Sequence, residues 1–151
     1  MTARLVSVEL RNDEYIVSAN SQTEAGFWIS VGTPFRLPDS APAGKLGQVI
    51  RDALSQSQQG VPTPPRDADS PARPLLDLLG LPDYASYMKG ARSVEVYAEG
   101  IGTDESIEVT PKRNEGARGG FTTIDEQAKV FPYDSPGQLG TEVIRAFDKA
   151  L

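Results

Sequence analysis

Acidic side chains concentrate in one stretch of the second half of the chain. Between Ser93 and Pro111 there are five carboxylates and no Lys or Arg. The alternation of Val94 and Val96 predicts a strand whose other face carries Glu95, Tyr97 and Glu99. Glu108, between Ile107 and Val109, is expected on the same side of a neighbouring strand. We expect a surface of carboxylates and one tyrosine, which is either a solubilising sheet face or a binding surface for a cationic partner. Its residues are Glu95, Tyr97, Glu99, Asp104, Glu105 and Glu108.

Catalysis by this surface would need two carboxylates that act as general acid and base. Strand geometry suggests one such pair, Glu95 with Glu108, and nothing in the sequence indicates a raised pKa for either. The chain has no cysteine and no histidine, so thiolate nucleophiles and the commonest general base are missing. The acids also lack the spacing of a calcium loop. We therefore expect no enzyme activity, no catalytic residue, no metal and no cofactor.

A tryptophan, a glycine-rich loop and a glycine pair can each be explained either by structure or by function. Trp28 is the sole tryptophan and could anchor an interface, but its place between Phe27 and Ile29 favours a core strand. Residues 115–120 are either a turn or a flexible loop that presents Arg118. Gly100 and Gly102 belong to a hairpin turn, because no third glycine opens a helix to make a dinucleotide-binding motif.

Composition places the chain among ordinary single domains. It has 151 residues, 38% of them hydrophobic, and a net charge of −6. An acidic balance disfavours direct nucleic-acid binding and favours a basic partner. No secretory signal and no apolar run of about 18 residues is present, so we expect a cytoplasmic protein without membrane contact.

The elements that would position the acidic residues occur twice. Residues 3–8 resemble residues 91–96, and Leu46-Gly47-Gln48-Val49-Ile50-Arg51 returns near the C-terminus as Leu139-Gly140-Thr141-Glu142-Val143-Ile144-Arg145, one residue longer. Each helical stretch follows β-rich segments and a turn with Ser and Pro. In the first copy, residues 15–19 and 27–31 are expected strands, residues 20–24 a break, and Asp39 or Ser40 the N-cap of the helix.

We therefore predict an α+β fold of two tandem β-β-β-α repeats. The repeats form a mostly antiparallel sheet packed against helices, with approximate twofold symmetry. A single domain 1–151 divides into a first repeat (1–58), a Pro-rich linker (59–74), a short helical insert (75–90) and a second repeat (91–151). The linker is a tether or a proline-motif ligand.

Several of these segments together resemble a known family. They are Gly26-Phe27-Trp28-Ile29, the Leu37-Pro38 segment before Leu46-Gly47, and the run Leu79-Gly80, Tyr84, Lys89-Gly90-Ala91 and Val94-Glu95-Val96. The chain resembles the immunity proteins of bacterial contact-dependent growth inhibition systems. The resemblance implies a protein that binds the C-terminal toxin domain of a delivered effector, often a nuclease, and blocks its active site or substrate groove.

The sequence leaves two other functions open. One is a structural or protein-interaction module unrelated to toxins, and the other is an enzyme that uses carboxylates alone. For the immunity function, the partner-binding residues are expected to be the six named for the acidic surface.

Overall fold

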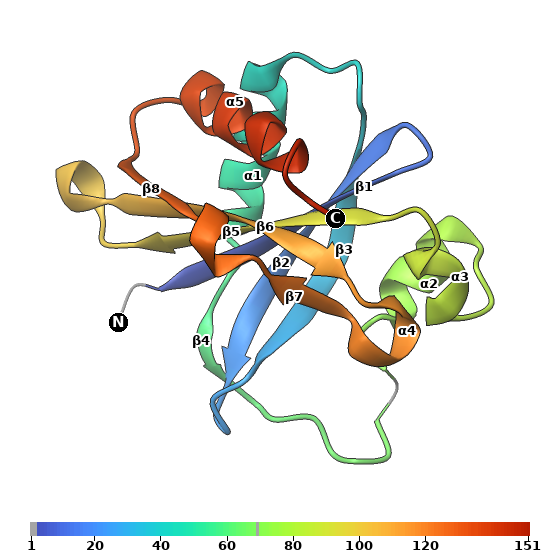
Figure 1. The fold of residues 1–151 in the computed structure, drawn as a ribbon. Helices are drawn as coiled ribbons and strands as arrows, with labels where there is room; N and C mark the ends of the chain where they lie inside the picture. Colours follow the sequence, from blue (N-terminus) through green and yellow to red (C-terminus); the bar gives the residue numbers. More distant parts are fainter. Residues whose placement is uncertain (1–2, 69) are drawn as a thin grey trace.

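One mixed sheet organises the molecule (Figure 1). The computed structural model describes residues 3–68 and 70–151. Within these ranges eight strands form the sheet in the order β3-β2-β1-β5-β6-β7, with β4 beside β2 and β8 beside β6. The pairs are antiparallel except β2 with β4. The strands are β1 (Arg4–Arg11), β2 (Glu14–Thr23), β3 (Trp28–Pro38), β4 (Gln59–Val61), β5 (Arg92–Glu99), β6 (Ser106–Asn114), β7 (Phe121–Thr123) and β8 (Lys129–Pro132).

Five α-helices among the described residues pack on this sheet, which confirms the predicted α+β fold class. They are α1 (Ala43–Leu54), α2 (Arg73–Leu79), α3 (Tyr84–Met88), α4 (Gly116–Gly119) and α5 (Pro136–Phe147), with short 3-10 turns η1 (Gly102–Asp104) and η2 (Asp125–Gln127). Helices α1 and α5 lie against each other on one face (Figure 1). Within the described residues, no helix is both long enough and apolar enough to cross a membrane.

The main core lies between the sheet and the pair α1–α5. Both helices bury residues spaced as one amphipathic face, and the strands contribute the alternate residues that face them. From the strands these include Val6, Val8, Val17, Val94, Val96 and Ile107. A second, smaller core packs α2 and α3 on the opposite face, around Ile16, Leu76 and Tyr87.

The two halves meet in a symmetric register at the centre of the sheet. Val6 pairs with Val96 and Val8 with Val94. In the sequence comparison of the halves, Val6 corresponds to Val94 and Val8 to Val96. An exchange of the halves therefore maps the β1–β5 ladder onto itself around Ser7 and Glu95. This symmetry supports the division into two repeats, which itself stays a prediction.

The same symmetry holds at the crossing of α1 and α5. A Cβ added at Gly47 would lie 1.8 Å from the carbonyl oxygen of Pro136, and one added at Gly140 would lie 1.8 Å from that of Ala43. The two helices therefore cross with backbone against backbone, which only glycine allows. This explains why Leu-Gly occurs in both copies.

The structure corrects the alignment of the two helices. Buried positions in α1 are 46, 47, 49, 50, 53 and 54, and those in α5 are 139, 140, 142, 143, 146 and 147, a constant offset without an inserted residue. An extra residue would turn the following face by about 100°, which packing forbids. Ile144, which the longer alignment matches to the buried Ile50, is consequently 37% exposed. Glu142 takes the buried place of Val49, with ion pairs to Lys129 and Arg145.

Three local predictions in the first half were also wrong. Strand β2 continues through residues 20–23, because its polar side chains find hydrogen-bond partners on the sheet. Helix α1 starts at Ala43 with Pro42 as N-cap, without a side-chain cap from Asp39 or Ser40. Residues 59–61, assigned to the linker, form β4.

Candidate functional site

The face of the sheet opposite α1 and α5 is only partly covered. Helices α2 and α3 cover one end of it through the smaller core. Strand register places the side chains of the rest of this face in rows, and most of these side chains are polar. Ser18, Ser7, Glu95 and Thr110 are successive partners across four strands, and Asn20, Leu5, Tyr97 and Glu108 form the next row. We call the part of this face around Glu95, Tyr97, Glu99 and Glu108 the acidic strip.

Glu95 lies at the centre of the open face, where β1 meets β5. Its carboxylate lies 3.4 Å from the amino nitrogen of Lys112. Both side chains are largely shielded, at 22% and 14% exposure. Lys112 therefore neutralises one charge of the acidic strip. The sequence did not indicate this pairing, because Lys112 lies one residue outside the acidic stretch from Ser93 to Pro111.

Tyr97 connects the other acids of the strip. Its hydroxyl donates a hydrogen bond to the carboxylate of Glu99, and Glu108 is its direct partner on β6. The hydrogen bond to Glu99, with partial burial and the charges of Glu99 and Glu108, raises the pKa of Tyr97 to about 12. Tyr97 is thus an un-ionised donor held between two carboxylates. The structure places Glu95, Tyr97, Glu99 and Glu108 together as the alternation predicted.

Glu105 does not belong to this surface. It is 5% exposed, and its carboxylate accepts from Arg4 at 2.5 Å and from Arg51 at 2.7 Å. Burial alone would raise the pKa of Glu105, but the hydrogen bonds and charges of Arg51 and Arg4 outweigh burial and lower it. The prediction that Glu105 is a surface acid was wrong because two arginines distant in sequence enclose it. Asp104 is exposed in η1, at the turn that joins β5 and β6.

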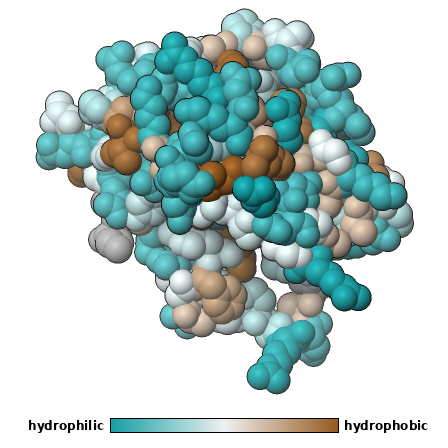
Figure 2. All heavy atoms as spheres, viewed as in Figure 1, coloured by the Kyte–Doolittle hydropathy of each residue, from teal (hydrophilic) through white to brown (hydrophobic). Residues whose placement is uncertain are grey.

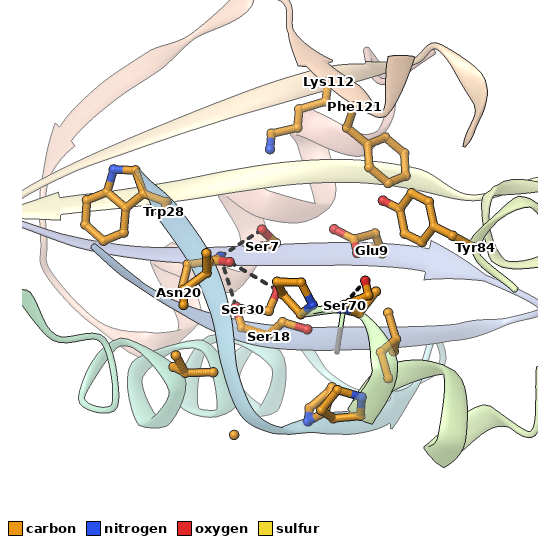
Figure 3. A pocket seen from close by; sticks show the side chains of 18 residues that line it. Ser7, Glu9, Ser18, Asn20, Trp28, Ser30, Ser70, Tyr84, Lys112 and Phe121 are labelled. Carbon is orange, nitrogen blue, oxygen red and sulfur yellow. Dashed lines mark hydrogen bonds between the residues drawn. The ribbon is translucent and has the colours of Figure 1, made fainter. Parts of the chain in front are cut away.

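A cavity of about 460 Å³ opens beside the acidic strip (Figure 3). Its floor is the polar part of β1 and β2, with Ser7, Ser18 and Asn20. Its walls come from β3, from the segment before α2, and from α3, β6 and β7. The aromatic and charged residues around it are Trp28, Tyr84, Phe121, Glu9 and Lys112.

The position of Trp28 and its neighbours differs from the predicted one. Residues 27–31 were predicted as a core strand, but β3 is the edge of the sheet and Phe27 is 50% exposed. Trp28 and Ile29 line the cavity. A hydrophobic run on an edge strand has the same composition as a core strand, so only the topology separates the two.

Glu9 is a buried carboxylate that the sequence did not single out. It accepts hydrogen bonds from the Tyr87 hydroxyl at 3.0 Å and the Ser93 hydroxyl at 2.8 Å. Burial raises the pKa of Glu9, and these two hydrogen bonds and the charge of Lys112 oppose the rise. The bond from Tyr87 ties α3 to β1. Glu9 therefore joins the sheet to the helical insert as well as lining the cavity.

The arrangement is suited to binding. Glu95 and Glu108 lie on adjacent strands of the face but are not direct partners, because Glu95 pairs with Thr110 and Glu108 pairs with Tyr97 two residues further along. Glu95 is also held by Lys112. Within residues 3–68 and 70–151, no group of three or more His, Cys, Asp or Glu residues could hold a metal ion. The face visible in Figure 2 is mostly hydrophilic, with hydrophobic side chains in small groups. Charge and shape are thus the means of recognition that the surface offers.

The fold of this chain is similar to that of solved structures, although its sequence matches none of the families or curated proteins compared with it. No family model and no curated protein sequence matches the chain. Among solved structures, a protein of unknown function from Neisseria meningitidis superposes with a TM-score of 0.80 at 17% identity, over 99% of this chain and 96% of that one.

A chain of the CdiA-CT/CdiI toxin and immunity complex from Yersinia pseudotuberculosis superposes with a TM-score of 0.74 at 18% identity. The superposition covers 99% of this chain and 98% of that one. The protein therefore has the fold of a component of a contact-dependent toxin and immunity complex, in agreement with the family resemblance seen in its sequence.

Proposed function

We propose that this protein is an immunity protein that binds and neutralises the C-terminal toxin domain of a contact-dependent growth inhibition effector. The observation that carries the proposal is the shared fold, over 99% of the chain, with a component of a toxin and immunity complex. Of the two roles in such a complex, the immunity role suits a chain without histidine or cysteine and with net charge −6. Inhibition requires a complementary surface and no catalytic group.

The acidic strip is the proposed contact surface, with Glu95, Tyr97, Glu99 and Glu108, and with Asp104 at its edge. These carboxylates lie on the part of the sheet face that α2 and α3 leave uncovered, and Tyr97 adds an aromatic ring between them. Tyrosine commonly anchors interfaces, since it combines apolar area with a hydrogen-bonding hydroxyl. Glu105 is left out of the proposal because two arginines already bind it.

The toxin that fits this surface is a nuclease. A nuclease binds phosphate through basic residues, and an acidic face can occupy the groove meant for the nucleic acid. Inhibition would then follow from blocked access of the substrate. The proposal places the protein in the cytoplasm, where a delivered nuclease finds its substrate.

Capture of the partner tests the function. A tagged chain is used to isolate binding proteins from the producing strain, and the captured protein is identified and purified. The proposal expects a C-terminal domain of a large secreted protein whose activity stops at one equivalent of this chain. Capture of a protein without toxic activity would refute the immunity function.

Charge reversal then tests the surface. The triple variant Glu95→Lys, Glu99→Lys and Glu108→Lys is expected to lower the association rate at low salt by about tenfold or more, because steering by complementary charge is lost. A matched control reverses Asp52, Asp134 and Asp148, which are exposed and lie in or beside the α1–α5 layer. Both triples change the net charge equally, so an equal effect of the two would refute the acidic strip as the contact surface.

A further inference from the structure

The cavity on the open face has the properties of a small-molecule site. Its volume of about 460 Å³ lies within the roughly 300–1,000 Å³ of ligand pockets. Three aromatic side chains stand around it, and a polar floor lies beneath them (Figure 3). Ligand sites typically combine such apolar walls with a few polar groups that fix orientation.

The floor is held in place by hydrogen bonds. The amide nitrogen of Asn20 donates to the Ser7 hydroxyl at 3.0 Å, and the Ser30 hydroxyl donates to the Asn20 amide oxygen at 3.3 Å. These bonds join three strands, so their geometry is set by the sheet. A ligand would meet ordered polar groups, which reduces the entropy lost on binding.

Charge decides which ligand the cavity accepts. The two carboxylate oxygens of Glu9 already accept from Tyr87 and Ser93, and Glu9 is only 7% exposed. The amino nitrogen of Lys112 extends toward the Ser7 and Trp28 side of the cavity, away from Glu9 and Tyr84 (Figure 3). It has three N–H donors, and its ion-pair distance to Glu95 is a long 3.4 Å. An anionic group at Lys112 would therefore find free donors, whereas a cation would meet a carboxylate that is already satisfied.

We propose that this cavity binds a small aromatic carboxylate, with the carboxylate at Lys112 and the ring against Trp28. The aromatic surface of Trp28 and the polar floor at Ser7 and Asn20 then contact the two sides of the ligand. The test of this site uses no toxin, so its outcome is separate from that of the proposed immunity function.

Trp28 supplies the measurement, because it is the only tryptophan and its indole N–H gives a single NMR signal. The ¹⁵N-labelled protein is titrated with hippurate, with its neutral amide N-benzoylglycinamide, and with the cation benzamidine. Hippurate is expected to shift the Trp28 signal saturably and to bind about tenfold or more tightly than the amide, since it alone forms a charge-assisted hydrogen bond with Lys112. Absence of a saturable shift, or equal binding of benzamidine, would overturn the proposal.

Variants locate the charge. Lys112→Met is expected to bind hippurate and the amide equally, and Lys45→Met, on the far side of the sheet, is expected to keep the preference for hippurate. Glu95→Gln removes the competing carboxylate and should strengthen hippurate binding without a change for the amide. If Lys112→Met does not fold, Glu95→Gln tests whether Lys112 binds the carboxylate. Weaker hippurate binding in Glu95→Gln would contradict the assignment of Lys112.

Discussion

The contact between α1 and α5 makes a quantitative prediction for Gly140→Ala. The new Cβ would lie 1.8 Å from the Ala43 carbonyl oxygen, whereas ordinary contact begins at 3.4 Å. The helices must therefore separate by about 1.6 Å at this point, and a gap of even 0.5–1 Å loses a quarter to a half of the dispersion energy of the atoms that line it. The clash is with backbone, so no side-chain rotation relieves it. We expect Gly140→Ala to lower the free energy of unfolding by about 3 kcal/mol or more, the upper part of the range for overpacking.

Gly47→Ala should cost a similar amount, because its Cβ meets the Pro136 carbonyl oxygen at the same distance of 1.8 Å. The double variant adds a sharper test. Once the helices have separated for one methyl group, the second needs little further movement. The cost of Gly47→Ala with Gly140→Ala should therefore be clearly less than the sum of the single costs.

Urea denaturation followed by far-UV circular dichroism measures these changes. Gly44→Ala is the matched control in α1, since no atom of the described residues outside its own helix turn lies within 4 Å of its added Cβ. It should gain up to about 1 kcal/mol from helix propensity. Gly137→Ala is the control in α5, with its nearest atom at 3.9 Å. A Gly140→Ala variant as stable as its control would refute the close crossing of the helices, and full additivity would refute a shared separation.

Three further predictions concern single side chains. Ser57→Ala should cost about 1–3 kcal/mol in urea denaturation, because its buried hydroxyl bridges a backbone N–H of β1 and a carbonyl of β2, and the exposed Ser55→Ala should change little. Glu105→Gln should destabilise the protein at pH 7 and make its free energy of unfolding depend less on pH in acid. The lowered pKa of Glu105 stabilises the wild type above the unfolded pKa of about 4.3. The wild type loses this stabilisation as the pH falls through the folded pKa. An equal pH dependence of the free energy of unfolding in the wild type and in Glu105→Gln would contradict this prediction. Glu99→Gln should bring the pKa of Tyr97 down from about 12 toward about 10 in an NMR pH titration, and an unchanged value would show that Glu99 does not hold the hydroxyl.

The sequence predicted the features that depend on local periodicity. Alternation at Val94 and Val96 placed Glu95, Tyr97 and Glu99 on one face, as strand geometry requires. The features that were missed depend on contacts between distant segments. Glu105 is buried because Arg4 and Arg51 reach it from other elements. The cavity likewise forms only when β3, β6 and the segment before α2 meet.

The two faces of the sheet differ in how similar the residues of the two halves are. On the core face, Val6 and Val8 correspond to Val94 and Val96, and the helices on it meet through equivalent glycines. The open face has Ser7, Glu9 and Arg11 in the first half where the second has Glu95, Tyr97 and Glu99. The shared core needs equal side chains on both sides of its symmetry axis, because α1 and α5 pack on it symmetrically. The open face has no such requirement. Its two halves therefore differ in charge. The acidic strip lies over β5 and β6, and the cavity, with Glu9 and Trp28, lies beside β1, β2 and β3.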